Sequence, residues 1–211
     1  MRRLLLALAV GLALAAPAAA VVYPVRPYDA PLLARAATPH EQIAESVAQR
    51  LTRKAAVVRC AAGHLKPGEL GVTPFVNDRP AGYFLMAPET CGLLAAFRAN
   101  PNAYDPEACT DTACLNRVAQ VAMALETISH ESYHLLGYRD EATAECYGLQ
   151  SLWYSAVRLG ASAQLGETLG SLYANQMYPS RRTSAHPEYW SAECRNGGKL
   201  DLRPKSSAWP S

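Results

Sequence analysis

The stretch TACLNRVAQVAMALETISHESYHLLG, residues 112–137, decides the fold of this chain. Its larger apolar side chains recur every three or four residues, a spacing that aligns them along one side of a helix. These residues are Val118, Val121, Leu125 and Ile128. We therefore predict one long helix over 112–136, which Gly137 ends. Because apolar residues cover the faces of this helix, we expect it to lie at the centre of the domain.

Further helices are expected on both sides of this central one. The sequence TPHE, residues 38–41, is a capping box with proline at the first helical position, and it predicts a helix over 39–54. Asp140 is placed to cap a second long helix, over 141–159. The remaining helices are expected over 88–97 and 162–176, with a loop over 100–108 and an irregular, proline-rich tail from Met177 onward.

Short strands are expected between the predicted helices over 39–54 and 88–97. Residues 55–59, 70–76 and 82–86 are rich in β-branched, apolar or aromatic side chains, and 77–80 would turn the chain between the last two. These segments predict a short antiparallel sheet on one side of the helices. The expected fold class is α+β, mainly helical.

The first residues predict export from the cytosol. Arg2 and Arg3 precede an apolar run that is too short to span a membrane comfortably, and small residues follow it at 18–20. We interpret 1–20 as a signal peptide, with an uncleaved anchor as the alternative. A cleaved chain would have no stable membrane association. Residues 21–37 are expected to form an extended N-terminal arm, and 38–211 a single domain.

The six cysteines predict disulfides in an exported chain, because thiols are not kept reduced outside the cytosol. The alternative, a zinc-cysteine cluster, is disfavoured because the cysteines lack the C-x-x-C spacing. Cys109 and Cys114 are expected to close a small loop before the central helix. Cys146 is expected to fix the second helix through a disulfide, and Cys194 to hold the tail.

The charge balance argues against a nucleic-acid partner. Lys and Arg number 20 and Asp and Glu 18, and two of the arginines belong to the predicted leader. The remaining chain is therefore near neutral, with no electrostatic basis for binding nucleic acid or an anionic membrane.

The segment HESYH, residues 130–134, predicts a metal site. A separation of four residues places His130 and His134 on one face of a helix, one turn apart, where both imidazoles can bind one ion. Zinc held there would lower the pKa of a bound water to roughly 7, and Glu131 would accept the proton of that water as general base. The alternative is a helix with two histidines that merely pack in the core or on the surface.

A catalytic zinc needs a third protein ligand, and Asp140, Glu141 and Glu145 are the candidates that follow closely. The pair HExxH and Glu141-x-x-Ala144-Glu145 resembles the gluzincin metallopeptidases. That resemblance implies that Glu141 binds zinc and that Glu145 orients one of the zinc-binding histidines without binding the zinc itself. Only six residues separate His134 from Glu141, fewer than is usual in larger members, so Glu145 stays open as the ligand.

A weaker resemblance connects the same region to the metzincins. HESYHLLGYRD, residues 130–140, is similar to HExxHxxGxxH with Asp140 in the final position, and Met177-Tyr178-Pro179 is similar to a Met-turn. This resemblance would make Asp140 the third ligand. The predicted continuous helix over 141–159 disagrees with it, since metzincins have an irregular segment there.

The prediction that follows is a secreted zinc-dependent hydrolase, by resemblance a metallopeptidase acting on peptides or proteins with one Zn²⁺ per chain. His186 is a candidate donor to the oxyanion that forms during hydrolysis, whereas Tyr133 and Tyr147 are expected to pack in the core. His40 and His64 are expected to have no role in the reaction. The alternative function is a non-catalytic zinc-binding or disulfide-stabilised interaction domain.

Overall fold

The computed structural model of the protein describes residues 25–210. The predicted signal peptide, residues 1–20, lies outside this range. The described chain is an α+β domain, mainly helical, as predicted. Its helices are α1 (Ala30–Ala34), α2 (Pro39–Thr52), α3 (Pro88–Ala99), α4 (Thr112–Leu135), α5 (Glu141–Arg158) and α6 (Ala163–Leu172). Its strands are β1 (Val57–Cys60), β2 (Gly71–Val72), β3 (Phe75–Val76), β4 (Arg79–Pro80) and β5 (Tyr83–Met86).

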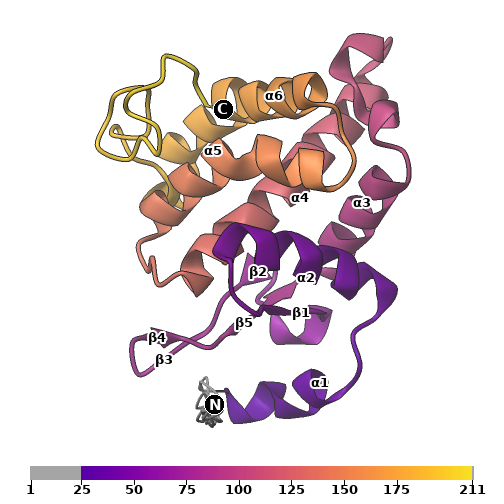
Figure 1. The fold of residues 1–211 in the computed structure, drawn as a ribbon, viewed down its shortest axis with the longest axis vertical. Helices are drawn as coiled ribbons and strands as arrows, with labels where there is room; N and C mark the ends of the chain where they lie inside the picture. The colour runs from indigo at the N-terminus through magenta and orange to yellow at the C-terminus, as the bar shows by residue number, and fades with distance from the viewer. Residues whose placement is uncertain (1–24, 211) are drawn as a thin grey trace, which may run out of the picture.

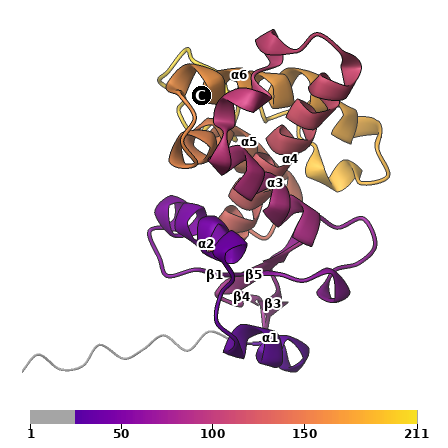
Figure 2. The ribbon, with the colours of Figure 1, turned by 90° about the vertical axis from the view of Figure 1, so that its right-hand side faces the viewer.

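Helix α4 runs through the middle of the molecule, with α2, α3 and α5 packed against it (Figures 1 and 2). The four apolar residues that predicted this helix are all buried in the main hydrophobic core. Its bounds agree with the prediction within one residue. Within residues 25–210, no helix is both long enough and apolar enough to cross a membrane.

The sheet lies at the opposite end of the molecule from α6 (Figure 1). Its strand order is β1-β5-β2, with β5 parallel to β1 and antiparallel to β2. The prediction of a purely antiparallel sheet was therefore wrong. The chain reverses once between β1 and β2 and again in the β3–β4 hairpin, and two reversals return β5 to the direction of β1. The predicted strand 70–76 is accordingly split between β2 and β3.

The two faces of β5 pack against different layers, because successive side chains of a strand point to opposite faces. Phe84 and Met86 enter the main core. Tyr83 and Leu85 belong to a smaller cluster on the other face, which Leu32 and Leu33 of α1 cover. The segment predicted as an extended arm thus contains a short helix, since the sheet's second face needs an apolar cover.

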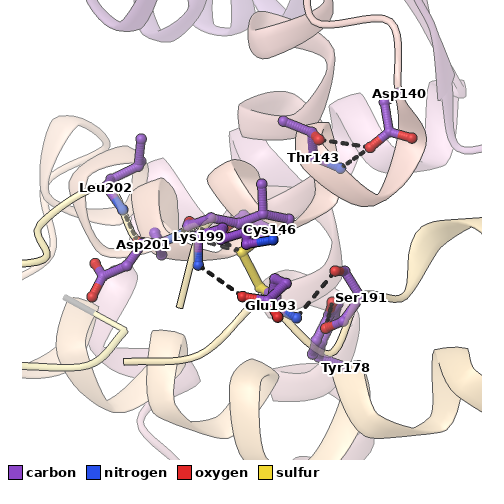
Figure 3. The surroundings of a disulfide bond; sticks show 12 residues. Asp140, Thr143, Cys146, Tyr178, Ser191, Glu193, Lys199, Asp201 and Leu202 are labelled. Carbon is purple, nitrogen blue, oxygen red and sulfur yellow. Dashed lines mark hydrogen bonds between the residues drawn. A yellow bond between two sulfur atoms is a disulfide. The ribbon is translucent and has the colours of Figure 1, made fainter. Parts of the chain in front are cut away.

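The six cysteines form three disulfides within the described residues. Cys109–Cys114 closes the small loop before α4, as predicted. Cys60–Cys91 joins the end of β1 to α3. Cys146–Cys194 joins α5 to the C-terminal segment, whose loops surround this bond (Figure 3). The irregular tail is therefore fixed to a helix of the core, as the sequence predicted.

The predicted capping box at the start of α2 is present, and its glutamate does more than cap. The buried Glu41 carboxylate accepts hydrogen bonds from the backbone N–H of Thr38 (2.7 Å) and of Cys60 (2.8 Å), and it pairs with Arg35. Although burial acts in the opposite direction, these donors lower the pKa of Glu41 to about 2. Glu41 thereby joins α2 to the end of β1.

We expect Glu41→Gln to destabilise the fold at neutral pH by up to about 3 kcal/mol, because the carboxylate binds its proton more weakly when folded than when unfolded. A lowered pKa stabilises the fold above the unfolded value of 4.5, and this contribution is lost as the pH falls toward about 2. Urea unfolding of both proteins between pH 7 and pH 2.5 measures the difference. A gap that stays constant over that range would contradict the assignment.

Candidate metal centre

Helix α4 brings the predicted site residues into the interior of the molecule. His130, Glu131 and His134 lie in its last turns, and each is at most 5% exposed. The helix ends directly after them, and Gly137 follows with a φ of 103°, which glycine adopts without strain. The chain can therefore turn back at once, and α5 starts at Glu141 beside the same histidines.

Three ligand atoms converge at this point. His130 Nε2 lies 2.9 Å from His134 Nε2, and Glu141 Oε2 lies 3.2 Å from each of these nitrogens. Three donors bound to one tetrahedral zinc at about 2.0–2.1 Å would be separated by about 3.3 Å. The three atoms therefore have nearly the spacing that a shared metal ion requires, and their chemistry, two imidazoles and one carboxylate, suits zinc.

The other two acidic candidates lie elsewhere. Asp140 is the N-cap of α5, and its exposed carboxylate accepts hydrogen bonds from the N–H (2.8 Å) and hydroxyl of Thr143 (Figure 3). Glu145, one turn after Glu141, lies on the far side of His130, with Oε2 3.3 Å from Nδ1. The structure thus brings Glu141 to the Nε2 atoms and Glu145 to the opposite ring nitrogen.

Close packing of α4 against α5 makes this arrangement possible. A Cβ atom at Gly148 would lie 2.7 Å from Glu126 Oε1 and 3.0 Å from the backbone nitrogen of His130. Any larger residue would therefore push the helices apart. Ser129 of α4 and Ser155 of α5 are also small, and their hydroxyl oxygens lie 2.7 Å apart. Small residues thus line this contact between the two helices.

The Nδ1 atoms of both histidines face acceptors, which directs their Nε2 atoms to the shared point. His134 Nδ1 donates to the carbonyl oxygen of Tyr138 at 2.6 Å, so its Nε2 carries the free lone pair. His130 Nδ1 makes an ion-pair contact with Glu145 without the geometry of a hydrogen bond. Glu126 Oε1 lies 3.8 Å from the same nitrogen and, within residues 25–210, accepts no hydrogen bond.

Negative charge is concentrated around these histidines. Burial, reinforced by the nearby Glu145 carboxylate, raises the pKa of Glu126 well above its usual range. Burial opposes the protonation of His130, but contacts with Glu141 and Glu145 outweigh it and raise the pKa of His130. The same histidines lower the pKa of Glu141 to about 2 despite its burial. The cluster therefore attracts positive charge strongly, as a cation site should.

The Glu131 side chain packs against strand β2 and lines the same cleft as the three converging atoms. Its Oε2 atom accepts a hydrogen bond of 2.7 Å from the Thr73 hydroxyl, which is also 3.1 Å from the Glu131 backbone carbonyl. Burial raises the pKa of Glu131, while the histidines and Thr73 act in the opposite direction. A Cβ at Gly71 would lie 2.9 Å from Glu131 Cγ, so β2 lies directly on this side chain.

The C-terminal segment forms the remaining wall of a cleft of about 610 Å³. Arg181 Nε donates to Glu145 Oε1 at 3.0 Å, and its guanidinium lies 5.4 Å from the centre of the Tyr189 ring. The Tyr189 ring in turn stacks on His130 at 5.5 Å. His186 also lines the cleft, but it is exposed and its Nδ1 lies 3.1 Å from Glu188.

Several residues of the site were missed by the sequence analysis. Glu126 precedes His130 by four residues, so the helical spacing that identified His134 could also have identified it. Thr73, Arg181 and Tyr189 carry no such signal, because they come from the link between β2 and β3 and from the C-terminal segment, both distant from α4 in sequence. Only the tertiary fold places them at α4.

Comparisons of this chain with protein-family models, with curated proteins and with solved structures found no match. The interpretation of the site therefore depends on its geometry and on the sequence motif.

We expect Glu141→Ala to weaken zinc binding far more than Glu145→Gln, because Glu141 reaches both Nε2 atoms whereas Glu145 contacts only the outer nitrogen of His130. For Glu145→Gln we expect zinc affinity to fall about 10- to 100-fold. This is the usual effect of removing a residue that contacts a metal ligand but not the metal itself. Competition with a chromogenic chelator measures these affinities.

Asp140→Asn is the control for this series, because asparagine caps a helix as well as aspartate does. It should bind zinc like the unchanged chain. Zinc affinity that is unchanged in Glu141→Ala, or reduced in Asp140→Asn, would contradict the ligand set.

Proposed function

We propose that this chain is a zinc-dependent hydrolase, and in particular a secreted metallopeptidase. The observation that carries the proposal is the convergence of His130, His134 and Glu141 beside a buried carboxylate, Glu131, that is not one of the three. Three protein ligands with one open position are typical of catalytic rather than structural zinc. A bound zinc would supply a Lewis acid and would lower the pKa of a coordinated water to roughly 7.

The surroundings of Glu131 support a role as general base. Burying a carboxylate is costly unless it is paired, and Glu131 is only 4% exposed. Within residues 25–210, its side chain accepts a hydrogen bond only at Oε2, from Thr73. Its Oε1 atom therefore keeps the capacity to accept a proton from water and to pass it to the departing amine.

A peptide substrate is supported by the edge strand of the sheet. Strand β2 pairs with β5 on one side only and lines the cleft with Gly71, Val72 and the following Thr73. An extended peptide can add to such an edge through backbone hydrogen bonds, which hold it without reading its side chains. Gly71 of this edge strand lies against Glu131, so a peptide bound to the strand would pass near the proposed base.

A donor to the oxyanion is proposed from the C-terminal wall. Hydrolysis of an amide passes through a tetrahedral intermediate whose negative oxygen needs a hydrogen-bond donor. Tyr189 is favoured over the predicted His186, because the Tyr189 ring lies against His130 whereas His186 is exposed and paired with Glu188. Action outside the cytosol is supported by the three disulfides.

We expect Glu131→Gln to retain zinc and to lose hydrolysis, by on the order of 10²–10⁴-fold in kcat, because glutamine has the same shape but cannot accept the proton. Zinc content by mass spectrometry and cleavage of unfolded casein measure the two properties. Glu167→Gln, the same change on the exposed side of α6, is the matched control. Full hydrolysis by Glu131→Gln would refute the proposed base, and absence of bound zinc in the unchanged chain would refute the site.

We expect Thr73→Val to lower kcat by about tenfold or more, because it removes a hydrogen bond to an ionised group that fixes the orientation of Glu131. Thr73→Ser keeps the hydroxyl and should retain most of the activity. Zinc affinity should be the same in both variants, because Thr73 does not contact the three ligand atoms. Equal losses of activity in the valine and serine variants would contradict this role, because serine keeps the hydroxyl that donates to Glu131.

A further inference from the structure

A second cavity, of about 550 Å³, lies between α3 and α4. Its walls are mainly apolar, and the side chains of Leu70, Leu93 and Met123 that line it are each partly exposed. Half-buried apolar side chains around a hollow are a favourable environment for a further apolar group, since its burial releases it from water.

This cavity adjoins the cleft that contains His130 and His134. Leu70 lines both hollows, and the next residue, Gly71, lies directly on Glu131 and Thr127. On α4, Met123 and Ala124 line the second cavity, and Thr127, one turn later, lines the cleft. The two hollows therefore follow one another along the same helix, on the side where β2 crosses it.

The distance between them corresponds to a few residues of an extended peptide. Ala124 precedes His130 by six residues of helix, which at 1.5 Å per residue is about 9 Å. An extended chain advances about 3.3 Å per residue, so this separation corresponds to about three residues. A peptide with its bond at the histidines can thus place a side chain two to four residues away in the cavity.

Gly92 leaves the cavity open from the side of α3. Glycine in the interior of a helix costs about 0.5–1 kcal/mol relative to alanine. Packing does not require it here, because a Cβ at Gly92 would meet no atom within 4 Å. This contrasts with Gly71 and Gly148, where a Cβ would collide with Glu131 or Glu126. The effect of Gly92 is therefore to keep space free in the cavity wall.

We propose that this cavity is a specificity subsite, which binds a large apolar side chain of a peptide substrate two to four residues from the bond that is cut. The inference rests on the proposed function and names a substrate class for it: peptides with leucine, phenylalanine or methionine at one fixed distance from the scissile bond. Gly92 and Met123 are the residues that determine this preference.

The test is cleavage of a pooled peptide library by the zinc-loaded protein, with products identified by mass spectrometry. The unchanged chain should cleave peptides with a large apolar residue at one such position about tenfold faster than peptides with serine there. Gly92→Leu, which fills the cavity, should abolish this preference, so that the ratio of the two cleavage rates falls to about one. Met123→Gln is the second variant, for use if Gly92→Leu does not fold. It keeps the length of the side chain but makes its end polar, and it should reduce the preference.

Ala99→Leu is the matched control, because it places the same leucine side chain at an exposed position of α3 outside the cavity. It should keep the preference of the unchanged chain. Cleavage without any positional preference, or a preference that survives in both Gly92→Leu and Met123→Gln, would overturn the subsite and leave the proposed hydrolase intact. A zinc-loaded chain that cleaves no peptide in the library would overturn the hydrolase and the subsite together.

Discussion

The close approach of α5 to α4 is the constraint on which the rest of the site depends. Gly148 lets the two helices come near enough for Glu141 and Glu145 to reach His130 from opposite sides. Buried ionisable groups are costly unless they are paired, and here four glutamates surround two histidines in the interior. Burial raises the pKa of Glu126 and Glu131, whereas contacts with the histidines lower that of Glu141 and Glu145. A divalent cation between the Nε2 atoms and Glu141 would compensate this negative charge.

The parts of the chain that complete the site come from outside the helix pair. Strand β2 lies against Glu131 and is followed by Thr73, while the C-terminal segment supplies Arg181 and Tyr189. The disulfide Cys146–Cys194 joins that segment to α5 at the residue after Glu145. The same turn of α5 therefore holds both the carboxylate behind His130 and the covalent attachment of the cleft wall. Since Glu145 also accepts from Tyr173 at 2.7 Å, the wall and the metal centre share one polar network.

The main core and the candidate site share helix α4. The apolar side chains of α4 and the inner face of the sheet form the main core, and the capping box of α2 joins this core to β1. The polar end of α4 contributes the site and little apolar packing. Metal binding and folding are coupled in such an arrangement, because the ion stabilises only the state in which the ligands converge. The active region would therefore be the part of the fold most sensitive to loss of metal.

The sequence by itself determined helices α2 to α6, the disulfide-rich character and the two histidines with Glu131, because helical periodicity, capping residues and the HExxH spacing are local signals. It also favoured Glu141, but it could not exclude Glu145 or Asp140, since all three lie within residues 140–145. The tertiary structure separates the three candidates: the chain reverses at Gly137, Asp140 caps α5, and of the three carboxylates Glu141 is the one that lies 3.2 Å from both Nε2 atoms. It also decided the mixed sheet and the roles of Thr73, Arg181 and Tyr189, because these depend on strand order and on contacts between segments far apart in the chain.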